Sequence, residues 1–79
     1  MQLPAIFCYI FQNETPIKQL EIALSEQKTN LKCELNSLHF EVSNRNFNLV
    51  SFHSTNCIMA DMKIKYLEKI IQSKKSKLP

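Results

Sequence analysis

Apolar residues recur with helical spacing in the first half of the chain. An isoleucine or leucine stands at every seventh residue from Ile17 to Leu38. Residues with this spacing share one face of an α-helix. The pattern therefore predicts an amphipathic helix over about residues 16–43 with a coiled-coil-like apolar seam. The expected seam residues of this helix are Ile17, Leu20, Leu24, Leu31, Leu35, Leu38 and Val42.

This stripe has two interpretations. It is either the core stripe of one small domain or the seam of a coiled coil with another helix. At about 1.5 Å per residue the stripe is about 35 Å long or more. So short a chain has little else with which to cover it, and we therefore favour the seam.

Polar residues interrupt the seam at three d positions, where leucine would be expected. These residues are Gln27, Glu34 and Glu41. Polar side chains at d positions lower the stability of a coiled coil and restrict its register or its oligomeric state.

The expected start of this helix is marked by Thr15 and Pro16. Threonine is a favourable N-cap residue. Proline is tolerated at the first helical position, where its missing N–H group has no partner to lose. The helix is therefore expected to begin at Pro16, with Thr15 as its cap.

The helical pattern is weakest over residues 44–56. Asparagine and serine are frequent here, and their side chains compete for backbone hydrogen bonds. We expect a weak break or loop over about 44–56, although the apolar stripe can also be continued as helix through Leu49 and Phe52. The alternative is a β-hairpin over 38–52, because apolar and polar residues alternate from Leu38 to Val42. The chain would then be a small α+β domain.

A second amphipathic pattern predicts a helix over about residues 57–76. Asp61 and Lys65 lie four residues apart there, which favours an ion pair along one helix face. The residues expected to extend the seam, or to fold back on it, are Met59, Met62, Tyr66 and Ile70.

The composition supports a mainly helical chain. Glycine is absent from all 79 residues, and residues 17–78 also lack proline. Tight turns with a positive φ normally use glycine. A fold rich in such turns is therefore disfavoured, and the expected fold class is all-α.

The N-terminal segment differs from the rest of the chain. Residues 3–11 are apolar and rich in aromatic and β-branched side chains. This is typical of a short buried strand, or of an irregular segment packed on a helix. The expected organisation is a short apolar segment over residues 1–15, followed by a single helical, coiled-coil module over residues 16–79 with a basic tail.

Positive charge is concentrated at the C-terminal end. The chain has a formal net charge of +3, and residues 63–79 carry six lysines against Glu68, a net charge of +5. Such a tail is typical of a solvated helix end, and it is also suited to contact phosphate groups of nucleic acid or of an anionic membrane. The expected basic patch consists of Lys69, Lys74, Lys75 and Lys77.

The sequence offers little for catalysis or metal binding. The candidate metal ligands are Cys33, His39, His53 and Cys57. Cys33 and His39 are six residues apart, unlike the close pairs of zinc sites. No metal, cofactor or catalytic residue is therefore predicted. Three cysteines without a CxxC pair favour reduced thiols and an intracellular location, cytoplasmic or nuclear.

These observations predict a non-enzymatic coiled-coil module for protein–protein interaction, acting as a scaffold or in oligomerisation. The expected partner is a second copy of the chain or another helical protein, with no small-molecule substrate. A weak contact with polyanions or anionic lipid is a further expectation. The alternatives are a small α+β binding domain and a basic-tail module that contacts nucleic acid or an anionic membrane.

Overall fold

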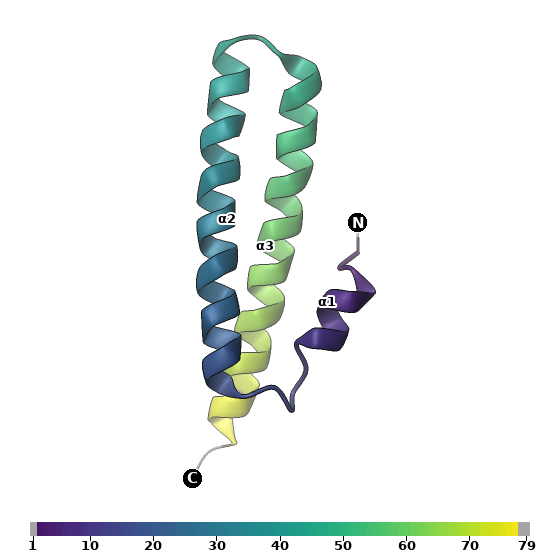
Figure 1. Cartoon of the computed structure of the whole chain (residues 1–79), viewed down its shortest axis with the longest axis vertical. Coiled ribbons are helices and arrows are strands. Elements are labelled where there is room, and N and C mark those ends of the chain that lie inside the picture. The colour runs from purple at the N-terminus through teal and green to yellow at the C-terminus, as the bar shows by residue number, and fades with distance from the viewer. Residues whose placement is uncertain (1, 78–79) are drawn as a thin grey trace.

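The computed structural model describes residues 2–77, which form three helices (Figure 1). Helix α1 spans Ala5–Ile10, α2 spans Ile17–Ser43 and α3 spans Phe47–Ser76. No residue from 2 to 77 is in a strand. The all-α prediction is therefore confirmed. The alternative of an α+β domain with a hairpin over 38–52 is wrong, because that stretch is helical on both sides of a short connection.

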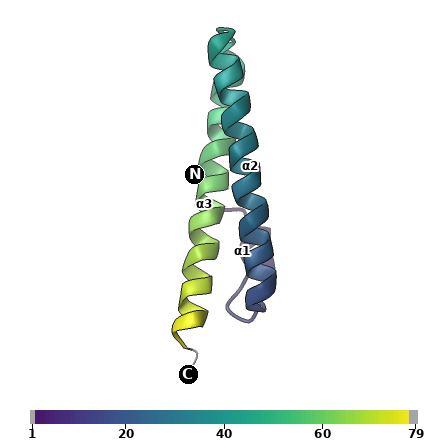
Figure 2. The ribbon, with the colours of Figure 1, turned by 90° about the vertical axis from the view of Figure 1, so that its left-hand side faces the viewer.

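Helices α2 and α3 lie side by side and antiparallel, as the two arms of a helical hairpin (Figures 1 and 2). We call the end with the α2–α3 connection the tip, and the end where α2 begins and α3 ends the base. The molecule is elongated, with extents of 52 × 20 × 15 Å. The short α1 lies beside the half of α3 that is nearer the base (Figure 1). A third helix thus covers the hairpin only toward its base.

The contact between α2 and α3 follows alternating steps of three and four residues on both helices. On α2 the buried or half-buried positions with this spacing are Leu20, Leu24, Gln27, Leu31, Glu34, Leu38 and Glu41. On α3 they are Val50, His53, Cys57, Ala60, Ile64, Leu67, Ile71 and Lys74. We call these two sets the hairpin seam. Its spacing is that of a heptad pattern, and it lies within a single chain.

The best-buried side chains all lie in the half of the hairpin near the base. Leu20 and Leu67 have no exposed surface. The cluster around them contains Phe7, Leu20, Ala23, Leu67, Ile70 and Ile71. In contrast, every residue from 24 to 59 is half-buried or exposed. The hydrophobic core is therefore confined to the end that α1 covers.

The connection at the tip turns tightly without glycine. The N–H group of Arg45 donates to the carbonyl of Val42 over 3.1 Å. The N–H group of Asn46 donates to the carbonyl of Glu41 over 3.0 Å. These two bonds form a Schellman motif, which requires a left-handed residue after the helix. Arg45 takes this conformation, with φ of 57°.

The break between the two long helices is much shorter than the predicted loop over 44–56. Helix α3 begins at Phe47, ten residues before the predicted second helix over 57–76. Serine and asparagine each cost only about 0.5 kcal/mol relative to alanine in a helix. The seam positions from Val50 onward pack against α2, and this packing outweighs the weak helical propensity.

The N-terminal segment, expected to be a strand or irregular, contains the helix α1. Phe7 is buried, and its ring packs against those of Phe11 and Tyr66 at centroid distances of 4.9 and 5.8 Å. The hydroxyl of Tyr66 donates to the carbonyl of Phe11 over 2.7 Å. Aromatic packing and a hydrogen bond at its C-terminal end therefore hold α1 on the hairpin.

Thr15 does not cap α2, contrary to the sequence prediction. The residue before the helix is Pro16, and no side chain caps its N-terminus. The hydroxyl of Thr15 instead donates to the carbonyl of Ile10 and accepts from the N–H group of Gln12, over 3.2 and 3.0 Å. Local hydrogen bonding has competed with capping, and it ties the α1–α2 linker to the end of α1.

Candidate interaction surface

Much of the stripe predicted on α2 faces α3 of the same chain. Leu20 is buried, and Ile17, Leu24, Leu31 and Leu38 are half-buried. The polar residues at the d positions also face α3. These five apolar residues of the stripe are therefore largely covered.

Leu35 and Val42, also predicted as seam residues, do not face α3. Their exposed fractions are 40% and 51%. Each follows a polar seam residue, Glu34 or Glu41, by one position, and one residue turns the helix by about 100°. Their role in contact with another chain stays a prediction.

Three of the four residues predicted to extend the seam on α3 lie beside its contact with α2. Met59, Tyr66 and Ile70 each precede a seam residue by one position. Met62 is two residues from the seam residue on each side of it, which puts it on the side of α3 away from α2. Ile70 is buried, and the other three are half-buried. Tyr66 and Ile70 pack in the cluster around Phe7 of α1. This second stripe on α3 therefore serves α1.

The residues of α3 that do face α2 were missed. Their spacing of three and four is present in the sequence from Cys57 to Ile71. This spacing is hard to recognise because the larger side chains of the second stripe lie between the seam residues. A small seam residue such as Ala60 also contributes little to an apolar pattern. The signal that distinguishes the seam is its uninterrupted three–four spacing from Cys57 to Ile71.

The second stripe of α3 continues toward the tip, where α1 no longer covers it. Its next large residues are Leu49 and Phe52, which are 40% and 58% exposed. Phe40 on α2 is 65% exposed and lies one position before a seam residue. Ala23 also lies one position before a seam residue, and it packs in the buried cluster that contains Phe7 of α1. Helical spacing therefore puts Phe40 on the α1 side of the hairpin. We call Phe40, Leu49 and Phe52 the open face.

A shallow groove between α2 and α3 leads from α1 toward the open face. Residues on both helices line it, among them Asn30, Cys33, Asn56, Met59 and Lys63. The ammonium group of Lys63 lies over the ring of Phe7, 5.3 Å from its centroid. The groove thus adjoins the surface that α1 covers.

The other side of the hairpin has its own exposed apolar residues. Leu35, Val42 and Phe47 lie on it, and Phe47 is 69% exposed. The same helical spacing puts all three away from the side that α1 covers. We call these three residues the opposite face.

Charge is sparse near the tip. Between residues 35 and 58 the charged side chains are those of Glu41 and Arg45, one of each sign. The predicted basic patch lies at the base. Lys69, Lys75 and Lys77 are exposed there.

The remaining lysine of the patch, Lys74, is half-buried and donates to the carbonyl of Asn13 in the α1–α2 linker. At the middle of α3, the predicted pair of Asp61 and Lys65 is confirmed, with 2.9 Å between Oδ2 and Nζ. The charges of α3 near the base thus have partly local, structural roles.

One polar cluster lies in the seam between the two long helices. Nδ1 of His53 lies 2.7 Å from Oε2 of Glu34, and this hydrogen bond spans from α3 to α2. Burial, and secondarily the Glu34 carboxylate, raises the pKa of the Cys57 thiol. A thiol that stays protonated at neutral pH is a poor nucleophile. The cluster therefore joins the helices rather than activating Cys57.

The candidate metal ligands are dispersed. Cys33 and His39 are exposed on α2, whereas His53 is bonded to Glu34. Among residues 2–77, no three His, Cys, Asp or Glu side chains come together as a metal site. All three cysteines are free thiols.

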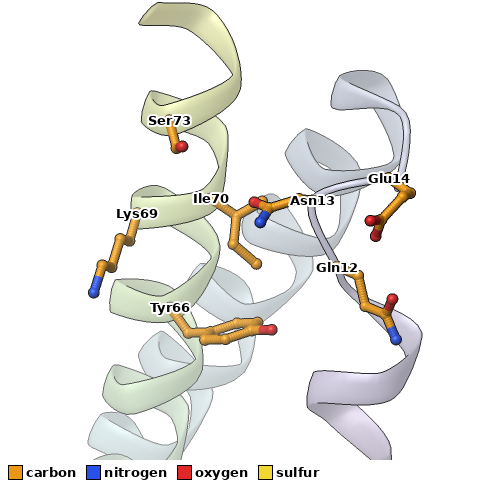
Figure 3. Close-up of a pocket in the computed structure, with 7 residues that line it drawn as sticks. All are labelled: Gln12, Asn13, Glu14, Tyr66, Lys69, Ile70 and Ser73. Atoms are coloured by element: carbon orange, nitrogen blue, oxygen red, sulfur yellow. The ribbon is translucent and has the colours of Figure 1, made fainter. Parts of the chain in front are cut away.

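A notch lies where the α1–α2 linker passes α3 (Figure 3). The Tyr66 ring and Ile70 face the linker residues Gln12 and Asn13, while the side chain of Lys69 points away (Figure 3). Burial, with the nearby Cys8 thiol, raises the pKa of Tyr66, which keeps its hydroxyl a hydrogen-bond donor. The notch is thus the joint that holds α1.

No helix within residues 2–77 has the length and apolar character needed to cross a membrane. The chain matches no family model, no curated protein and no solved structure.

Proposed function

We propose that this chain is a non-enzymatic helical-hairpin module that binds a helical protein partner. The observation that carries this proposal is the amount of apolar surface left outside the core. Eleven large hydrophobic side chains are exposed among the described residues, whereas eight hydrophobic residues are buried. Exposed apolar patches beyond the usual scatter mark interaction sites.

The total surface area supports the same proposal. The chain exposes 5826 Å², whereas a compact monomer of 9.2 kDa exposes about 4,900 Å². The excess of about 900 Å² is close to the area that one partner buries in a standard protein interface, about 800 Å². The elongated shape of the chain therefore offers enough surface for a protein interface of ordinary size.

The experiment that tests this function combines sedimentation velocity with circular dichroism over a concentration series. We expect the sedimenting mass and the thermal midpoint to rise with protein concentration, because association stabilises the folded state by mass action. A compact monomer whose helicity and midpoint ignore concentration would contradict self-binding. If the chain is a monomer, the proposal requires that it bind amphipathic helical peptides. A monomer that binds none of these peptides would contradict the proposed function.

A further inference from the structure

We propose that the open face packs against the open face of a second copy, giving a symmetric dimer in which the tips overlap and the bases point apart. This inference rests on the proposed function and names its partner. It is carried by the continuity of one apolar stripe, by the neutral tip, and by the position of α1.

The stripe on α3 is one surface with two halves. Toward the base, the Tyr66 ring packs against Phe7 of α1, and Ile70 belongs to the same buried cluster. Toward the tip, Leu49 and Phe52 continue the same stripe without a cover. A helix pair from a second copy would thus extend an interface that the chain already makes with its own α1.

Charge favours a second copy as the occupant. In a two-fold interface the same patch meets itself, so the patch must be its own complement. The tip has one carboxylate, on Glu41, and one guanidinium, on Arg45. Glu41 faces α3 within the hairpin, so the tip adds no net charge that would oppose the approach of a second copy.

The base sets the orientation. Residues 63–77 carry a net charge of +5, and residues 14–28, at the base end of α2, carry a net charge of −1. The base therefore keeps a net positive charge, and two copies aligned base to base would repel each other. Helix α1 also occupies the base half of the same face, and it blocks overlap along the whole hairpin (Figure 1). Both effects restrict the contact to the tip halves and put the bases at opposite ends.

A membrane is a less favourable occupant of the open face. Binding to anionic lipid gains from lysines beside the apolar surface. Here the lysines lie at the base of a molecule 52 Å long, and the apolar open face lies near the tip. The two features therefore cannot easily act on one lipid surface together.

The test compares the two faces of the tip by sedimentation equilibrium. The double variant Phe40→Glu/Phe52→Glu places charges on the open face, and Val42→Glu/Phe47→Glu does the same on the opposite face. We expect the open-face variant to dissociate with a constant about 100-fold higher or more, because two aromatic side chains lose their burial. The opposite-face variant should keep the constant of the original chain. Phe40→Ala/Phe52→Ala repeats the comparison without added charge, in case the glutamates reduce helicity.

The outcomes separate this inference from the proposed function. If the opposite-face variant dissociates and the open-face variant does not, the open-face dimer is wrong while self-binding stands. If the original chain stays a monomer and its stability ignores concentration, both self-binding and this dimer fail. A monomer that binds phosphatidylcholine vesicles through Phe40 and Phe52 overturns the dimer in favour of a membrane.

A cysteine cross-link tests the orientation. In a chain with Cys8, Cys33 and Cys57 replaced by alanine, Asn56→Cys places a thiol in the groove beside the open face and keeps the apolar side chains of that face. Under mild oxidation we expect its disulfide dimer to form about tenfold faster or more than that of Phe47→Cys, because the dimer holds the two thiols at a high effective concentration. Equal rates, or a faster Phe47→Cys, would contradict the proposed arrangement.

Discussion

At the scale of single residues, Arg45 bears the conformational cost of the tip. Its φ of 57° lies in the left-handed region, where a side chain crowds its own backbone. The hydrogen bonds from Arg45 and Asn46 back into α2 hold it there. The tip is thus a position where the chain uses a strained residue in a role that glycine normally fills.

Replacing Arg45 with glycine should stabilise the protein. Glycine removes the steric cost of the left-handed conformation, and we expect a gain of about 1 kcal/mol in the free energy of unfolding. Urea denaturation followed by circular dichroism measures it. Ser51→Gly, at an exposed position inside α3, is the control and should instead lose about 0.5 kcal/mol. Destabilisation by Arg45→Gly would show that the side chain itself holds the turn.

Tyr66 joins α1 to the hairpin through both its ring, which packs against Phe7, and its hydroxyl. This hydroxyl donates to the carbonyl of Phe11, at the end of α1. Since burial raises the pKa of Tyr66, the folded protein retains this proton at a pH where the unfolded chain has begun to lose it. The resulting stabilisation is fully present below the unfolded pKa of about 10 and is lost as pH rises through the folded pKa.

Tyr66→Phe should therefore change both stability and its pH dependence. At neutral pH we expect a loss of about 1 kcal/mol, the usual net value of one hydrogen bond. Between about pH 9 and pH 11 the variant should lose less stability than the original chain, because one titrating group is gone. Thermal unfolding at a series of pH values provides the measurement. Tyr9→Phe, at a side chain that is 76% exposed, should alter neither property.

At the scale of elements, α3 presents two apolar stripes to two different helices. Its seam from Cys57 to Ile71 faces α2, and its second stripe, including Tyr66 and Ile70, faces α1. The two stripes meet at the base, where Leu67 is fully buried. The pairing of the long helices therefore depends most on that end.

Leu67→Ala should unfold the hairpin or nearly so. Removing a fully buried leucine costs about 2–5 kcal/mol, and the core of a chain of about this size rarely supplies more than about 3–5 kcal/mol. We expect loss of a cooperative thermal transition in circular dichroism. Leu35→Ala, at an exposed position of α2, should change the stability of the monomer by no more than about 0.5 kcal/mol. A similar loss in both variants would mean that burial at the base does not hold the helices together.

At the scale of the whole molecule, stability is unevenly distributed. The core lies near the base, and from residue 24 to residue 59 no side chain is fully buried. Segments with few buried apolar contacts open at low free energy. The tip half of the hairpin should therefore open before the base half does, unless a partner covers it.

Amide hydrogen exchange can measure this difference. At low protein concentration we expect slow exchange around Leu20 and Leu67 and faster exchange over residues 35–58. At high concentration the protection of residues 35–58 should increase, because association covers the tip. Protection that is uniform along both helices and independent of concentration would contradict both the uneven distribution of stability and the covering of the tip by a partner.

The sequence by itself determined that the chain is helical and where its first long helix lies. A regular apolar spacing from Ile17 to Leu38 is a local property of a helix face, so it could be read without knowledge of the fold. The heptad pattern also predicted the positions of the polar d residues, such as Glu34, which lie in the seam of the structure. Helix boundaries at residues 44–56 could not be read, because weak propensity there is overcome by packing on α2.

Only the tertiary structure decided which faces meet. Periodicity identifies a stripe, but it does not say whether the stripe is covered by the same chain or by another one. The fold back at Arg45 directs the stripe of α2 onto α3, and α1 covers half of the second stripe. The open face is what remains, because contact is a property of how helices are arranged in space and not of the order of residues along any one of them.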